Sequence, residues 1–174
     1  MDIYAANIDG LKASILTRPG LAYYHANAKS TGTAVKFRLL PAGQGSAGGL
    51  IATFAQQMAG ISHPAFDWDN SASVQLDITD CAKVLGVLGN NAGSIDDGKG
   101  LFARAGRCAA VLHLVRRDFP CVGYEFELMS CGPDGQQSRF RLVLSAAEAL
   151  GLEIALTHSL PLIAFGAPDA AAEI

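Results

Sequence analysis

The stretch from Arg139 to Phe165 combines a strand with a long apolar helix that follows it directly. Phe140, Leu142 and Leu144 alternate with Arg139, Arg141 and Val143, a period of two that predicts a strand with one buried face and two charges on the other. Ser145, with Glu148 three residues later, has the capping-box pattern that starts a helix. The strand is therefore expected to end at Leu144, and the helix to begin immediately after it.

The predicted helix is apolar on every side, which is more than a helix needs to pack against one sheet. Only Glu148 and Glu153 carry charge before Gly166 ends it, and Pro161 predicts a kink near Thr157. Such a helix needs partners on several sides, so it is either a buried core helix or an oligomerisation helix. In the second interpretation, the expected contact residues are Leu150, Leu156, Leu160 and Leu162.

The same strand-then-helix join occurs earlier in the chain. Val74, Leu76 and Ile78 alternate with polar residues, and Thr79 then opens an expected helix of about three turns. The two segments VQLDIT-DCAKVLG and FRLVLS-AAEALG share one pattern, which indicates an internal duplication.

Short connections between the other predicted strands complete the fold class. Consecutive strands with short turns pair antiparallel. We therefore predict an α+β protein with two four-stranded antiparallel sheets, each followed by a helix, a ββββα unit repeated twice. The expected organisation is an N-terminal arm or short helix at 1–20, a first repeat at 21–90, a linker at 91–100, a second repeat at 101–167 and a tail at 168–174.

Composition narrows the class of protein. Of the 174 residues, 50% are hydrophobic and 17% charged, which suggests self-association because it is a rich apolar content for a soluble monomer. No apolar run reaches the length of a membrane span, and the N-terminus has no signal-peptide pattern, so we expect a cytoplasmic protein without a membrane partner. The four cysteines form no C-x-x-C pair, which predicts free thiols and no metal site.

The titratable residues give little support to catalysis. The four histidines are scattered along the chain, and no serine or cysteine lies in a nucleophile-elbow pattern. We therefore predict a protein that is not an enzyme and uses no cofactor.

Three segments resemble the Whirly family of single-stranded DNA-binding proteins. They are GGLIATFAQQMAG, then FDWDN before SVQLDITDCAKVLGVLG, and finally THSLPLIAFG, in the order and spacing of that family. The resemblance runs from about residue 30 to residue 166. It implies two blade-like sheets, a tetramer whose helices meet at the centre, and single-stranded DNA as the partner. The Lys-Gly-Lys stretch of the plant proteins is replaced here by Ser30–Thr33, which argues against assembly beyond a tetramer and against high DNA affinity.

A binder that tolerates many sequences needs apolar platforms for bases and cations for phosphates. Strand alternation places Arg139 and Arg141 opposite the core-facing Phe140 and Leu142. The predicted nucleic-acid-binding residues are Lys29, Lys36, Arg38, Phe54, Phe66, Trp68, Arg116, Arg117, Tyr124, Arg139 and Arg141. Alternatively, Phe54 and Tyr124 belong to the sheet core, and the arginines form an ordinary solvated face.

Three other functions remain open from the sequence. The net charge of −3 favours an oligomeric scaffold of the same fold that binds no nucleic acid. An RNA-binding protein is also possible, because a site made of stacking and phosphate contacts discriminates weakly between DNA and RNA. A small-ligand-binding or enzymatic α+β domain is the third alternative.

Overall fold

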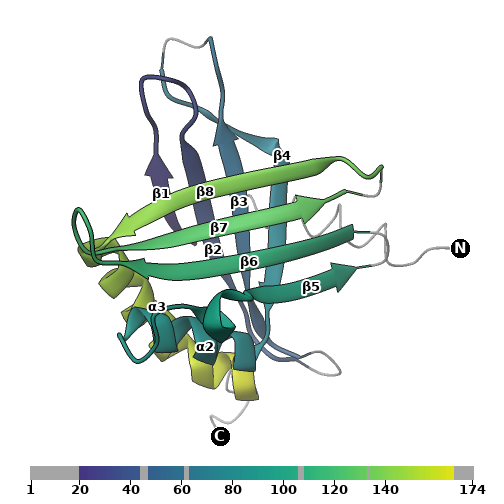
Figure 1. Cartoon of the computed structure of the whole chain (residues 1–174). Coiled ribbons are helices and arrows are strands. Elements are labelled where there is room, and N and C mark those ends of the chain that lie inside the picture. Colours follow the sequence, from purple (N-terminus) through teal and green to yellow (C-terminus); the bar gives the residue numbers. More distant parts are fainter. Residues whose placement is uncertain (1–19, 44–46, 61–62, 106–107, 133, 167–174) are drawn as a thin grey trace, which may run out of the picture.

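Two antiparallel sheets, each followed by a helix, make up the protein (Figure 1). The computed structural model describes residues 20–43, 47–60, 63–105, 108–132 and 134–166. The first sheet and its helix contain β1 (Leu21–His25), β2 (Thr33–Leu40), β3 (Gly49–Gln57), β4 (Phe66–Leu76) and α2 (Ile78–Leu88). A 3-10 turn, η1 (Ile95–Gly98), leads to β5 (Leu101–Ala105), β6 (Cys108–Arg117), β7 (Gly123–Cys131), β8 (Gln137–Ser145) and α3 (Ala146–Phe165).

Each sheet is a simple meander in which neighbours in sequence are neighbours in space. The orders are β1-β2-β3-β4 and β5-β6-β7-β8, with every pair antiparallel. The inner faces of the two sheets pack against each other, and their strands cross in Figure 1. Phe37 contacts Phe126 across this core at 5.9 Å between ring centroids, and Phe54 contacts Phe140 at 6.4 Å.

The two helices lie together at one end of the sheets and begin at side-chain caps (Figure 1). Ser145 accepts from the backbone N–H of Glu148, and the Glu148 carboxylate accepts in return from Ser145, so the predicted capping box is confirmed. Asp77 and Asp80 form the corresponding box, which starts α2 one residue before the predicted Thr79. The helix α3 continues through Pro161 to Phe165.

The fourth strand is longer than its alternation pattern predicts. The alternation around Val74 predicts a strand from Ser73, but β4 begins at Phe66, where Phe66 and Asp67 pair with the end of β3. A register shift between Phe54 and Gln56 interrupts the period of two, and Asp and Asn are uncommon in strands. For both reasons, the pattern of apolar residues does not predict the first part of β4.

The connection between the repeats is anchored in the shared core. Ile95, within the predicted linker 91–100, is 1% exposed and belongs to the same hydrophobic cluster as both sheets. His25 Nε2 on β1 lies 2.9 Å from the Glu148 carboxylate on α3, which joins the first repeat to the last helix. The predicted N-terminal helix and the tail 168–174 lie outside the described residues.

Candidate nucleic-acid interface

Strand alternation divides the predicted binding residues between the core and the outer faces of the sheets. Phe54 is fully buried against Phe140, and Tyr124 is 5% exposed with its hydroxyl 3.2 Å from the carbonyl of Leu88. We therefore correct the assignment of Phe54 and Tyr124 as stacking platforms. Both belong to the inner faces, because they share the strand parity of the other core residues.

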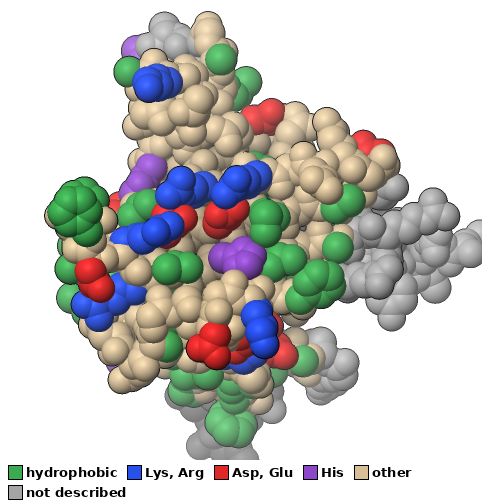
Figure 2. Space-filling model, in the orientation of Figure 1, with side chains coloured by type: hydrophobic (Ala, Val, Ile, Leu, Met, Phe, Trp, Pro, Cys, Tyr) green, Lys and Arg blue, Asp and Glu red, His purple; other side chains and the backbone are tan. Residues whose placement is uncertain are grey.

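Three predicted arginines form a row on the outer face of the second sheet. Arg117 on β6 and Arg139 and Arg141 on β8 flank the central strand β7, and more than half of the Arg139 and Arg141 side chains is exposed. Figure 2 shows basic side chains gathered over these strands, with acidic side chains among them. We call Arg117, Arg139 and Arg141 the arginine row.

Two carboxylates from β7 pair with the arginine row. The Glu125 carboxylate accepts from Arg141 Nη2 at 2.7 Å and from Arg117 at 2.9–3.0 Å, and Glu127 accepts from Arg139. Burial raises the pKa of Glu125, but the hydrogen bonds from Arg141 and Arg117 outweigh it and hold that pKa below its ordinary value. Three guanidinium groups thus face two carboxylates, so the row is far less cationic than its arginines alone suggest.

Arg116 and Lys29 lie apart from this row. Arg116 has the inward parity of Tyr124, its partner in the β6–β7 ladder, and its Nε lies 3.0 Å from a carboxylate oxygen of Asp118. Lys29 is exposed in the turn between β1 and β2, where its backbone N–H donates to the side chain of Asn27. Each therefore belongs to a different part of the surface from the arginine row.

An aromatic cluster occupies the outer face of the first sheet, at the end of β1 and the beginning of β4. The hairpins at this end of the sheet extend past β8 in Figure 1. The Tyr24 ring lies 5.7 Å from that of Phe66 and 6.3 Å from that of Trp68, measured between centroids. Tyr24 stands on β1 and the other two on β4, at opposite edges of the sheet. The rings can meet because the register places Ala34 and Ala55, small and fully buried, on the strands between them.

The cluster offers a stacking surface that the sequence indicated only in part. Phe66 and Trp68 are half-buried, whereas Tyr24, which was not among the predicted residues, is 59% exposed. The sequence LAYYH could have predicted this exposure. Leu21 and Tyr23 pack towards the core, so strand alternation places Tyr24 on the opposite, outer face. We call Tyr24, Phe66 and Trp68 the aromatic cluster.

The predicted cations on the same face are less accessible than their strand position implies. Lys36 and Arg38 alternate with the core residues Val35 and Phe37. Yet Lys36 is half-buried and Arg38 is only 4% exposed. Arg38 is therefore corrected from a surface cation to a buried one.

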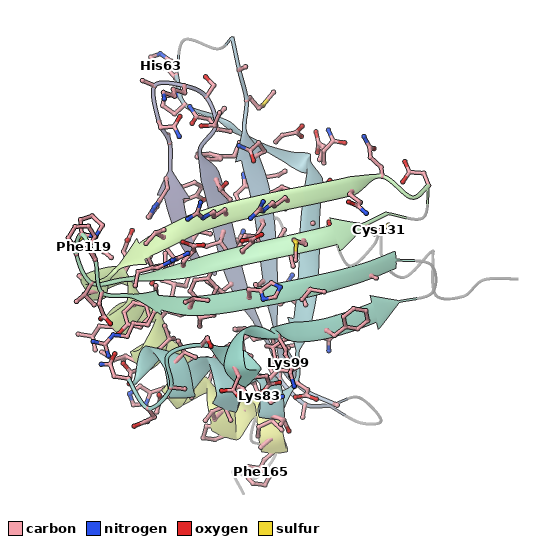
Figure 3. All side chains as sticks on the ribbon, in the orientation of Figure 1. His63, Lys83, Lys99, Phe119, Cys131 and Phe165 are labelled. Carbon is pink, nitrogen blue, oxygen red and sulfur yellow. The ribbon has the colours of Figure 1, made fainter. Side chains whose placement is uncertain are left out.

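The exposed side chains of α3 only partly match the predicted oligomerisation residues. Leu156 is 2% exposed and belongs to the core of its own subunit, while Leu160 and Leu162 are half-buried. Leu150 is 55% exposed, as an interface residue should be. The structure adds two exposed residues that the sequence did not single out: Ile154, one turn after Leu150, and Phe165, at the helix end (Figure 3).

The exposed side of α3 is an uncharged stripe. At helical spacing it contains Ala147, Leu150, Ile154, His158, Pro161 and Phe165, with no Lys, Arg, Asp or Glu among them. By length and composition α3 is also the one described helix that could cross a membrane, with 22% of its most apolar window buried in the subunit.

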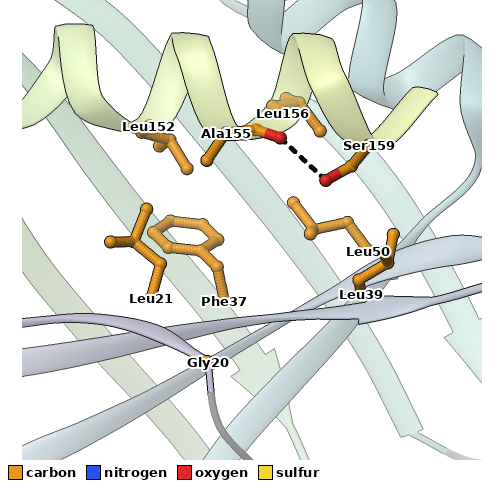
Figure 4. Close-up of a pocket in the computed structure, with 9 residues that line it drawn as sticks. All are labelled: Gly20, Leu21, Phe37, Leu39, Leu50, Leu152, Ala155, Leu156 and Ser159. Carbon is orange, nitrogen blue, oxygen red and sulfur yellow. Dashed lines mark hydrogen bonds between the residues drawn. The ribbon is translucent and has the colours of Figure 1, made fainter.

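Three features of the described residues bear on metal binding, nucleophiles and cavities. They contain no group of three or more His, Cys, Asp or Glu side chains placed to hold a metal ion. Burial raises the pKa of the Cys81 thiol to about 12, which removes it as a nucleophile at neutral pH. A cavity of about 170 Å³ between the first sheet and α3 is lined by apolar residues and Ser159, whose hydroxyl donates to the Ala155 carbonyl (Figure 4).

Comparison with known proteins identifies the fold. No protein-family model matches the sequence, and no curated protein sequence matches it. The solved structure of WHY1 from Arabidopsis thaliana is similar at 17% identity and a TM-score of 0.58, covering 84% of this chain and 85% of that one. WHY3 from the same plant gives 17% identity and a TM-score of 0.60, covering 84% and 88%. The chain therefore has a Whirly-like fold, which confirms both the resemblance and the fold class predicted from its sequence.

Proposed function

We propose that this protein binds single-stranded DNA without strong sequence preference and acts in replication, recombination or repair. The observation that carries the proposal is the aromatic cluster, with Tyr24 59% exposed, on the outer face of a Whirly-like sheet. Bases of every kind present a flat face, so stacking on such a ring does not depend on sequence. The same chemistry accepts RNA, which is the closest alternative partner.

Phosphate contacts in this proposal come from cations around each surface. Lys29 lies in the turn at the projecting end of the first sheet, and the arginine row lies on the second sheet. A net charge of −3 means that binding relies on these local cations and not on the field of the whole protein. Affinity is therefore expected to fall with salt: the logarithm of the binding constant should fall linearly with the logarithm of the salt concentration, with a slope of about −0.7 for each phosphate neutralised.

We further propose a homo-oligomer, specifically a tetramer, assembled through the uncharged stripe of α3. Leu150 and Ile154 are each more than half exposed in the single subunit, and no charged side chain interrupts the stripe around them. Burying such side chains stabilises association by about 25 cal/mol for each Å² of apolar surface removed from water. A location in the cytoplasm remains part of the proposal.

The second candidate function is a scaffold of the same fold that binds no nucleic acid. It is favoured by the carboxylates that neutralise the arginine row and by the negative net charge. The two functions differ in one measurable property, which is affinity for a single strand at low ionic strength.

The test uses the single tryptophan of the chain as a reporter. Trp68 belongs to the aromatic cluster, so intrinsic emission reports directly on that surface. Titration with oligo-dT should quench the emission, in parallel with a rise in anisotropy of a labelled oligo-dT, and both changes should reverse at high salt. Absence of both at low salt would favour the scaffold, while a rise in anisotropy without quenching would move the site away from the cluster.

A further inference from the structure

The pairing of the arginine row with Glu125 follows a diagonal pattern across three strands. In the ladders, Arg117 lies opposite Gly123 and Arg141 lies opposite Glu127, yet both guanidinium groups turn towards Glu125 on the central strand. Diagonal neighbours on one face are within reach of long side chains. Glu125 thus receives one arginine from each side.

This arrangement resembles a phosphate site whose anion is supplied by the protein itself. Guanidinium groups bind carboxylates and phosphates with the same planar fork of donors. The Glu125 side chain is 8% exposed, whereas half or more of the Arg117 and Arg141 side chains is exposed. The two guanidinium groups are therefore accessible to a ligand from solution, and the carboxylate beneath them already engages Nη2 of Arg141 and both Nε and Nη2 of Arg117.

We propose that Glu125 is an internal competitor for nucleic-acid phosphates and sets the affinity of the outer face of the second sheet. A phosphate that approaches Arg117 and Arg141 must share or displace the Glu125 carboxylate, and it is repelled by that charge until it does. Glu127 acts in the same way on Arg139, but with a single arginine. This inference rests on the proposed function, because it concerns the strength of the same binding activity.

The experiment compares single charge-neutralising variants of the full chain. Glu125→Gln keeps the shape and the carbonyl acceptor but removes the charge, so affinity for labelled oligo-dT should rise about tenfold at low salt. Glu127→Gln should give a smaller rise. Asp97→Asn, on the exposed η1 turn where Asn tolerates the left-handed backbone (φ 53°), changes the net charge equally and should leave affinity within about twofold.

Each outcome decides between the proposals. If wild type binds but Glu125→Gln, folded by its melting curve, binds no more tightly than Asp97→Asn, the competitor role is refuted and the proposed function stands. If wild type does not bind but Glu125→Gln does, the competitor role is supported and the proposed function fails for the native chain. If neither binds, both are refuted. Should Glu125→Gln fail to fold, the same comparison is made with Glu127→Gln, whose lack of any gain over Asp97→Asn would refute the proposal.

Discussion

Replacing Tyr24 with alanine tests the stacking surface most directly. The ring is 59% exposed, and its centroid lies 5.7 Å from that of Phe66 in a tilted contact and 6.3 Å from that of Trp68 in an edge-on contact. Removing it therefore costs the fold little, about 1 kcal/mol for the loss of two partly exposed aromatic contacts. A stacked base, in contrast, contributes about 1–3 kcal/mol, so affinity for oligo-dT should fall about 5- to 150-fold.

Two matched variants separate stacking from other effects. Tyr24→Phe keeps the ring and should bind within about twofold of wild type, because the hydroxyl takes no part in stacking. Phe102→Ala removes a comparably exposed ring, 71% exposed, from the outer face of the second sheet and should leave affinity unchanged. The assay is anisotropy of labelled oligo-dT at low salt, with a thermal melt for each variant. Wild-type affinity in Tyr24→Ala, with a loss in Phe102→Ala, would show that the bases stack on the other sheet.

Three further results follow from the structure. Arg139→Glu combined with Arg141→Glu should abolish oligo-dT binding measured by anisotropy, and unchanged affinity would exclude the arginine row from the site. The pKa of Glu125 in the folded protein lies below its ordinary value of 4.5, so its ion pairs stabilise the fold above pH 4.5 and are lost as the pH falls through the pKa of the folded state. The melting temperature should therefore stay constant from pH 7 to about 5 and drop at lower pH, and the drop should be smaller in Glu125→Gln. Leu150→Asp with Ile154→Asp should reduce the mass measured by light scattering to that of one subunit. An unchanged mass would exclude the α3 stripe as the interface. If the variant instead loses binding to lipid vesicles with no change in mass, the stripe is a lipid contact.

The architecture could be predicted from the sequence because its signals are local. The capping box at Ser145 and Glu148, the strand alternation before it and the repeat of the same join after Val74 each depend on neighbouring residues. Local consistency of this kind is what makes a fold readable from a single sequence. The start of β4 at Phe66 was missed because a register shift breaks the alternation there.

The candidate surfaces were harder to predict because they depend on register between strands. The contact between Tyr24 and Trp68 joins the two edge strands of a sheet, and it requires small residues on both strands between them. Likewise, the sequence alone indicates that Glu125 is an ordinary solvated carboxylate of β7. Its two arginine partners come from the neighbouring strands on either side, β6 and β8. Pairings of this type are set by the tertiary fold and have no fixed spacing in the sequence.

If the protein binds single-stranded DNA and assembles as proposed, the position of the two surfaces links the two properties. The inner faces of the sheets pack together, so the outer faces, with the aromatic cluster on one and the arginine row on the other, point away from each other. A short strand on one subunit therefore reaches only one surface, whereas a longer strand on an oligomer can use the aromatic cluster of one subunit and the arginine row of the next. The monomeric Leu150→Asp, Ile154→Asp variant should keep its affinity for a short oligo-dT that covers one site. Its affinity for a long oligo-dT should fall at least about tenfold, because binding of the strand at one site raises its effective concentration at the second site of an oligomer. Equal losses for short and long strands in anisotropy titrations would show that each subunit binds independently and that assembly serves another purpose.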